Sequence, residues 1–191
     1  MDGGLINIHA VLPRSSVNGP GKRVVVFFQG CQRRCEGCFN PATHPFDAGV
    51  LTPAEDILER YVAIDIEGLT VSGGEPFSQP RGLKALLESA RARGLTTLVY
   101  TGFKIEEIEA DPAMRACLAS IDVLVDGPYD ETRQEATLLP RGSTNQSFHF
   151  LTPRYSLHDL YMPGRSEVFI GADGMVRETG FSRITARPEI R

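Results

Sequence analysis

Residues 22–29 read KRVVVFFQ, and every side chain from Val24 to Phe28 is apolar. A strand that is apolar on both faces is typical of a parallel sheet that is covered on both sides. Three more short strands are predicted at residues 68–72, 95–100 and 121–125. Helical patterns separate these strands, so the sequence predicts βαβ units and an α/β fold. Residues 5–12 predict an additional strand at the edge of the sheet.

Two helices are predicted between these strands. Residues 52–55 read TPAE, which is typical of a capping box with proline at the first helical position. One apolar stripe follows it, formed by Ile57, Leu58, Tyr61 and Val62. The second helix is expected at residues 80–93, with one leucine-rich face and with Gly94 just after its last turn.

Composition limits the class of protein. The chain has 191 residues, which suits a single domain. Its 20 Lys and Arg against 24 Asp and Glu give a net charge of −4, so the basic footprint of a nucleic-acid-binding protein is absent. The sequence has no apolar run of ~20 residues and no signal-peptide pattern, so neither a membrane nor a secretory route is expected. We therefore expect a cytoplasmic protein without disulfides.

Three of the four cysteines lie close together directly after the first buried strand. Cys31, Cys35 and Cys38 have the spacing C-x3-C-x2-C, and a disulfide between any two would leave one thiol unpaired. Structural zinc takes four protein ligands, for which His44 or Cys117 is the candidate fourth. A 4Fe–4S cluster held by three thiolates keeps one iron open to a small chelating molecule. The spacing alone leaves an iron–sulfur cluster, zinc and unreactive thiols as alternatives.

Residues 31–40, CQRRCEGCFN, resemble the cluster loop of radical S-adenosylmethionine (SAM) enzymes. They are most similar to the loop in the family of activating proteins of anaerobic ribonucleotide reductase. The shared features are the cysteine spacing, the glycine before the last cysteine and the aromatic–Asn pair after it. This resemblance implies that Cys31, Cys35 and Cys38 hold three irons of one 4Fe–4S cluster, while SAM chelates the fourth iron.

A second motif, GGEP at residues 73–76, follows the second predicted strand. By itself it is weak, because such a sequence commonly ends a strand in an ordinary turn. In radical SAM enzymes this motif receives the methionine ammonium group of SAM. The resemblance therefore implies that SAM is bound by two groups of residues: Gly37, Cys38 and Phe39, with Phe39 near the adenine, and Gly73, Gly74, Glu75 and Pro76.

Later motifs extend the resemblance in the same order as in the family. They are YTGF at residues 100–103, DVLVDG at residues 122–127 and RGSTNQ at residues 141–146. The resemblance implies that Thr101 and Asp126 line SAM or a nearby cation. For Arg141 and Asn145 it leaves two roles open, closing the site or facing a partner.

The function implied by the resemblance is reductive cleavage of SAM at the cluster to a 5′-deoxyadenosyl radical. That radical would generate a glycyl radical on a large partner such as anaerobic ribonucleotide reductase, with a flavodoxin- or ferredoxin-like protein as the electron donor. Two alternatives remain open: a radical SAM enzyme that modifies a small molecule or a peptide, and a zinc-binding interaction module without enzymatic activity.

The strand–helix alternation and the resemblance together predict an incomplete parallel β/α barrel of the radical SAM type. We expect one domain over residues 1–191, with a core at about 5–150 and a C-terminal extension at about 151–191. Within that extension, residues 167–177 read as a β-hairpin with its turn at residues 171–174.

Cys117 is predicted to be a small buried hydrophobe on a helix. Arg33 and Arg34 lie inside the cysteine loop, where positive charge would stabilise an anionic cluster or contact a partner; the favoured prediction is that they are solvated.

Overall fold

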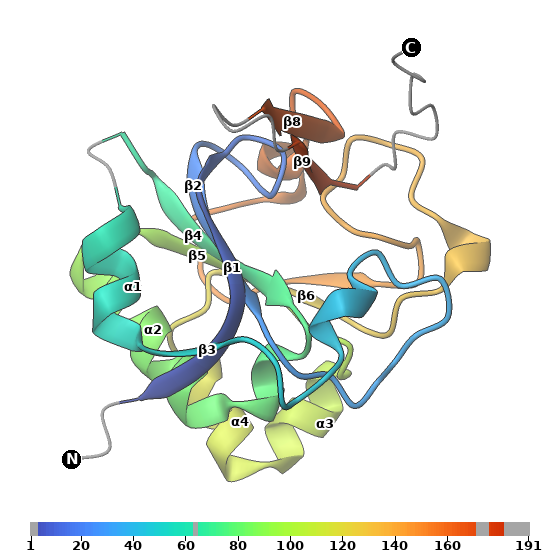
Figure 1. Ribbon diagram of the computed structural model, residues 1–191. Helices are drawn as coiled ribbons and strands as arrows, with labels where there is room; N and C mark the ends of the chain where they lie inside the picture. The colour runs from blue at the N-terminus through green and yellow to red at the C-terminus, as the bar shows by residue number, and fades with distance from the viewer. Residues whose placement is uncertain (1–3, 63–64, 171–175, 182–191) are drawn as a thin grey trace.

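The computed structural model describes residues 4–62, 65–170 and 176–181 (Figure 1). The helices are α1 (Ala54–Tyr61), α2 (Pro80–Ala92), α3 (Ile105–Ala110) and α4 (Pro112–Leu118). The strands are β1 (Leu5–Ser15), β2 (Arg23–Phe28), β3 (Val50–Pro53), β4 (Gly68–Gly73), β5 (Thr96–Tyr100), β6 (Val123–Asp126), β7 (Ser147–Phe150), β8 (Ser166–Ile170) and β9 (Val176–Gly180).

The central sheet has seven strands in the order β3-β1-β2-β4-β5-β6-β7. Strands β2, β4, β5 and β6 pair in parallel, so the predicted α/β fold around parallel strands is confirmed. The other pairings are antiparallel: β1 with β2 and with β3, and β7 with β6. The sheet is therefore mixed, with its parallel strands in the middle.

The N-terminal side of the sheet corrects two predictions. The strand predicted at residues 5–12 is β1, but it lies inside the sheet because β3 pairs with its outer side. Residues 50–53 form β3, so Thr52 belongs to a strand and does not cap a helix. Pro53 takes the N-cap position of α1 without a side-chain hydrogen bond, and the Thr52 hydroxyl donates to the Val50 carbonyl.

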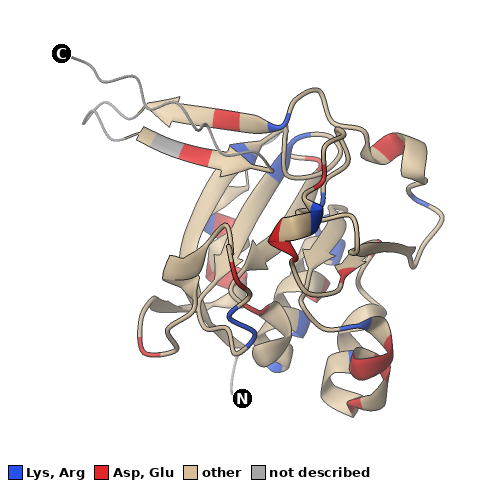
Figure 2. Cartoon of the chain, turned by 90° about the vertical axis from the view of Figure 1, so that its right-hand side faces the viewer, with Lys and Arg blue, Asp and Glu red and all other residues tan. Residues whose placement is uncertain are grey.

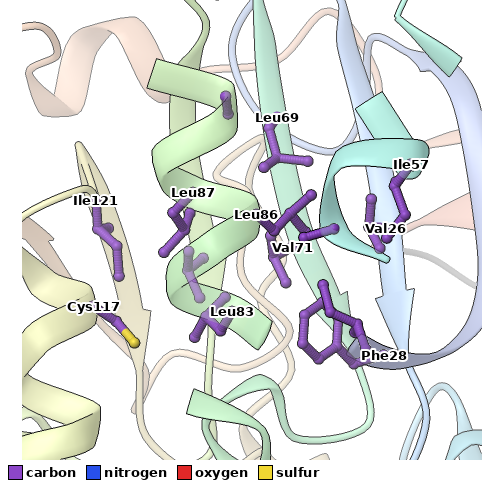
Figure 3. Close-up of a cluster of buried hydrophobic side chains, with 14 of the residues drawn as sticks. Val26, Phe28, Ile57, Leu69, Val71, Leu83, Leu86, Leu87, Cys117 and Ile121 are labelled. Carbon is purple, nitrogen blue, oxygen red and sulfur yellow. The ribbon is translucent and has the colours of Figure 1, made fainter. Parts of the chain in front are cut away.

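All four helices pack against one face of the sheet in a single apolar core. Leu83, Leu86 and Leu87 of α2 are fully buried, which confirms the predicted leucine face. Figure 3 shows these leucines between the sheet side chains of β2 and β4 and Cys117 of α4. Because the other face of the sheet is covered too, every residue of β2 except the half-buried Phe27 is buried, as expected for a central parallel strand.

The C-terminal part of the chain covers the opposite face. A second core joins Leu98, Val123 and Val125 of the sheet to Leu139 and Leu160. Strands β8 and β9 then form a separate antiparallel sheet, so the predicted hairpin is confirmed. Its turn at residues 171–174 and the end of the extension from residue 182 lie outside the described residues.

Arg23 is fully buried where β2, β4 and β5 begin. Its guanidinium donates to the hydroxyls of Thr70 and Thr96, at 2.7 and 3.0 Å, and to that of Tyr155 at 3.4 Å. It also donates to three backbone carbonyls, those of Pro20, Leu69 and Thr96. Burial lowers the pKa of Arg23, and the interaction with Tyr155 partly opposes that effect. Every one of these hydrogen-bond acceptors is electrically neutral.

Charged side chains of both signs are interspersed along the chain (Figure 2). Within the described part of the chain, no helix combines the length and the apolar character needed to cross a membrane.

Candidate functional site

A cavity of about 260 Å³ opens where the parallel strands end. It is lined by Ser72 and Gly73 at the end of β4, Tyr100 at the end of β5 and Gly127 just after β6. The loop that follows β2 supplies its next group of residues. Sites in α/β folds form at this edge of the sheet, so the topology makes the cavity the candidate site.

Cys31, Cys35 and Cys38 all line this cavity, as the sequence predicted for neighbouring strand ends. Cys31 is buried, whereas Cys35 and Cys38 are half-buried. The Asn40 N–H points at the Cys38 sulfur, 3.4 Å away, and the Cys38 N–H donates to the Cys35 carbonyl. Burial raises the pKa of the Cys31 thiol, and the backbone N–H groups of Arg34 and Arg33 partly offset this rise.

The donor set fits an iron–sulfur cluster. Among the described residues, no three His, Cys, Asp or Glu side chains meet closely enough to hold a single metal ion. A cluster does not need such a meeting point, because each thiolate binds a different iron. Three thiols from one short loop, all facing one cavity, could therefore hold three irons, with the fourth iron open towards the cavity.

Gly73 and Gly74 bring the end of β4 against the cysteine loop. The Gly74 N–H donates to the Phe28 carbonyl, and the Glu75 N–H donates to the Gly30 carbonyl, both at 2.8 Å. A Cβ on Gly73, whose φ is +102°, would lie 2.5 Å from the Phe28 nitrogen. Glycine at this position thus allows the two backbones to approach and the cavity to form next to the cysteines.

Glu75 is 1% exposed and joins the ends of β4 and β5. Its carboxylate accepts hydrogen bonds from the Thr101 hydroxyl and the Gly102 N–H, both at 2.8 Å, and from the Phe77 N–H at 3.0 Å. Burial raises the pKa of Glu75 to about 6, although these hydrogen bonds lower it. Glu75 thus lines the cavity while all of these hydrogen bonds stay within the protein.

The remaining predicted site residues divide between the cavity and its surroundings. Thr101 and Phe39 line the cavity, and the Phe39 ring lies 4.9 Å from that of Tyr129. Gly37, Pro76 and Asp126 are not among the described lining residues. Asp126 instead accepts a hydrogen bond from the Ile105 N–H at the start of α3, at 2.7 Å.

Arg141 and Asn145 make contacts within the protein. The Arg141 guanidinium forms an ion pair with Glu135 at 2.6 Å and donates to the Gln146 carbonyl at 2.8 Å. The Asn145 side-chain amide donates to the Pro128 carbonyl at 2.8 Å. Both residues therefore order the loop between β6 and β7, from which Gly127, Tyr129, Gly142 and Gln146 line the cavity.

The prediction for Arg33 is wrong. Its side chain stacks over the Phe103 ring at 4.2 Å and forms an ion pair with both carboxylate oxygens of Glu107 at 2.9 Å. Arg33 also lines the cavity. This pair joins the cysteine loop to α3, and a partner 74 residues away leaves no local signal in the sequence.

Cys117 is confirmed as a core residue. It is fully buried on α4, and its thiol donates to the Pro80 carbonyl at 3.3 Å. Burial raises the pKa of this thiol to about 11. His44, the other candidate fourth ligand, does line the cavity.

The chain matches known proteins over most of its length. A family model described as a 4Fe-4S single cluster domain matches residues 17–149. A protein of Haemophilus influenzae named anaerobic ribonucleoside-triphosphate reductase-activating protein is 35% identical over 149 residues, covering 72% of this chain and 93% of the relative.

Proteins of the same name from two other bacteria give similar matches. The Escherichia coli protein is 32% identical over 76% of this chain and 99% of its own length. The Vibrio cholerae protein is 33% identical over 77% of this chain and 99% of its own length. The alignments thus span nearly whole relatives but leave part of this chain outside.

Proposed function

Because the chain belongs to the 4Fe-4S single cluster domain family and to the family of anaerobic ribonucleoside-triphosphate reductase-activating proteins, we propose that it is a radical SAM activase. Its cofactors would be one 4Fe–4S cluster and SAM. Its target would be a glycine of a large partner of the anaerobic ribonucleotide reductase type. We interpret the four parallel strands as an incomplete barrel of the radical SAM type, within a single domain whose core covers about residues 5–150.

One observation carries the proposal: the three cysteines and the Gly73–Glu75 segment line the same cavity. These two motifs are 35 residues apart, counted from Cys38 to Gly73 (73 − 38). The parallel pairing of β2 with β4 brings their strand ends together. A cluster on the thiols would thus have its open iron beside the strand end at which SAM would bind.

When bound, the cluster would supply one electron to the SAM sulfonium, giving methionine and a 5′-deoxyadenosyl radical. The protein itself would position the two cofactors and exclude competing reactions. Cys31, Cys35 and Cys38 would hold the cluster, and the backbone at Gly73 and Gly74 would receive the methionine end of SAM. Glu75 ties that backbone to the end of β5, because its carboxylate accepts hydrogen bonds from the Thr101 hydroxyl and the Gly102 N–H.

The relatives' names supply the proposed partner. They are reductase-activating proteins, and the 5′-deoxyadenosyl radical formed in this chain's cavity would abstract hydrogen from the partner's glycine α-carbon. The electron would come from a flavodoxin- or ferredoxin-like protein, as the resemblance to the activase family implies.

Anaerobic reconstitution with iron and sulfide tests the cluster. We expect about four irons and four sulfides per chain, the content of one such cluster. Cys31→Ala, Cys35→Ala and Cys38→Ala should each lose the cluster and all formation of 5′-deoxyadenosine from SAM. Cys117→Ala is the matched control and should keep both, because Cys117 belongs to the core.

Two outcomes would contradict the proposal. A chain that binds one zinc and no sulfide, with His44 as the fourth ligand, would be a zinc protein. A chain that cleaves SAM but leaves no glycyl electron-spin signal on a purified anaerobic reductase would act on another substrate, such as a small molecule or a peptide.

A further inference from the structure

The C-terminal hairpin, defined as β8 with β9 and Phe181, forms part of the cavity. Glu178, Thr179, Gly180 and Phe181 line it together with the three cysteines. The family model ends at residue 149, before β8 begins. This part of the cavity is therefore built by a segment outside the match to the family model.

Both strands of the hairpin are fixed to the end of β1 and to the loop between β1 and β2. The Glu167 carboxylate of β8 accepts from the Ser15 hydroxyl at 2.7 Å and from the Ser16 N–H at 3.0 Å. The Thr179 hydroxyl of β9 accepts from the buried side-chain amide of Asn18 at 2.9 Å. Asn18 lines the cavity as well, so the hydrogen bond that anchors β9 lies in the cavity wall itself.

The end of the hairpin is fixed from a second side. The Phe181 ring packs at 5.6 Å from that of Tyr100, at the end of β5. The Phe181 N–H donates to the Arg165 carbonyl at 2.7 Å, and the Arg165 guanidinium donates back to the Phe181 carbonyl at 2.8 Å. The same guanidinium donates to the Glu135 carbonyl at 2.6 Å, which joins the hairpin to the loop between β6 and β7.

We propose that the C-terminal hairpin is a fixed wall of the cavity that keeps small hydrogen donors away from the 5′-deoxyadenosyl radical, so that the radical reacts with the partner's glycine. This inference rests on the proposed function. Glu167 is a positioning residue in it, since Glu167 is not among the described residues that line the cavity and acts by holding β8 in place.

The wall matters because two hydrogen donors compete for one radical. On the productive route, the glycine C–H bond breaks, the C–H bond of 5′-deoxyadenosine forms, and the unpaired electron stays on glycine. On the unproductive route, a small thiol from solution gives up its S–H hydrogen, and the electron remains on a thiyl radical. Exclusion of solvent molecules from a site suppresses such side reactions.

Glu167→Ala tests the wall in the full chain loaded with the cluster. The measurement is the number of 5′-deoxyadenosine molecules formed per glycyl radical on the purified reductase, with and without added dithiothreitol. We expect this ratio to rise at least about fivefold over that of the unaltered chain, because the variant loses two anchoring hydrogen bonds. The ratio should rise further when dithiothreitol is added. Iron and sulfide contents should stay unchanged.

Two further variants separate positioning from a general loss of structure. Glu167→Gln keeps a side-chain oxygen for the Ser16 N–H, so its ratio of 5′-deoxyadenosine to glycyl radical should stay close to that of the unaltered chain. Ile170→Thr changes a side chain of β8 that is 76% exposed, and it should behave like the unaltered chain. Amide hydrogen exchange of the β8 and β9 peptides, measured without cluster or SAM, should be faster only in Glu167→Ala.

The outcomes are distinct. Faster exchange in Glu167→Ala with an unchanged ratio would overturn the wall, and unchanged exchange would overturn the anchoring role of Glu167. If the unaltered, fully loaded chain forms no 5′-deoxyadenosine at all, the proposed function fails, and the wall's role fails with it. A normal yield of 5′-deoxyadenosine with an unchanged ratio in Glu167→Ala overturns the wall alone.

Discussion

Gly73 has a backbone conformation that only glycine adopts without strain, in a place with no room for a side chain. Its φ is +102°, and a Cβ would meet the Phe28 nitrogen at 2.5 Å and the Phe28 oxygen at 2.6 Å. Both contacts are backbone atoms of β2, which cannot move without breaking the sheet. We expect Gly73→Ala to lower the free energy of unfolding by about 3 kcal/mol, because strain and overpacking add.

Gly94 provides the matched control for this prediction. Its φ is +76°, but a Cβ added there would have no atom within 4 Å. Gly94→Ala should therefore lower the free energy of unfolding by only about 1 kcal/mol, the strain of a left-handed backbone conformation at alanine. Urea denaturation of both variants measures the difference, and equal losses would contradict the role of the close approach to Phe28.

Glu75 makes stability depend on pH. Burial raises its pKa in the folded chain to about 6, from 4.5. The folded state therefore binds the proton more tightly than the unfolded state, so the contribution of Glu75 is complete below about pH 4.5 and is lost as pH rises through about 6. The loss amounts to about 2 kcal/mol, because each pKa unit corresponds to about 1.4 kcal/mol.

Glu75→Gln tests this pH dependence. The unfolding free energy of the unaltered chain minus that of the variant should fall by about 2 kcal/mol between pH 4.5 and pH 7. Taking the difference cancels the groups that titrate alike in both proteins. A difference that stays constant over this range would show that the carboxyl group does not titrate there.

The local sequence predicted much of the site but not its internal connections. The three cysteines and Gly73–Glu75 follow two buried strands, so strand pairing was enough to predict that they share one cavity. Two contacts could not be predicted in this way. Arg33 meets Glu107 across 74 residues, and Ser15 meets Glu167 across 152 residues. No periodicity records a contact between a loop and a helix, or between the end of one strand and a distant hairpin.

At the level of secondary structure, the connection between the cysteine loop and α3 depends on one side chain. Arg33 bonds to Glu107 and stacks on Phe103. The Lys104 N–H and then Arg33 hold the pKa of Glu107 below its usual value. Since the ion pair is partly exposed, water screens it, and we assign about 1 kcal/mol to the ion pair and the stacking together.

Arg33→Ala should therefore loosen the cysteine loop without unfolding the chain. Loss of iron from the reconstituted protein to a chelator should become about fivefold faster, the factor that corresponds to about 1 kcal/mol. Arg33→Lys should give an intermediate rate, because lysine keeps the charge but has no planar fork for two carboxylate oxygens. Equal rates in all three proteins would contradict this role of Arg33.

The strands that the sequence did not predict are the short exposed ones. β3 and β7 have four residues each. Val50 and Leu51 of β3 are 65% and 67% exposed, so no buried alternation marks that strand. The parallel strands, in contrast, were recognisable because strands covered on both faces are rich in apolar residues, most clearly in β2.

Across the whole molecule, the buried Arg23 network and the Arg33–Glu107 pair lie at opposite ends of the parallel strands and differ in the kind of bond. At one end, Arg23 donates only to hydroxyls and carbonyls, and none of the ion pairs among the described residues includes it. At the other end, the partly exposed pair of Arg33 and Glu107 joins the cysteine loop to α3.

Ionic strength therefore acts on the Arg33–Glu107 pair, and on the exposed pairs of Asp65 with Arg14 and Lys22, but hardly on the Arg23 network. At about 1 M salt the screening length falls to about 3 Å, which weakens a partly exposed ion pair but leaves buried hydrogen bonds to neutral acceptors almost unchanged. Added sodium chloride should speed the loss of iron from the unaltered chain towards the rate of Arg33→Ala, while the salt response of Arg33→Ala itself stays small. The cysteine loop can thus be loosened reversibly, by the composition of the buffer, while the buried Arg23 network keeps β2, β4 and β5 assembled.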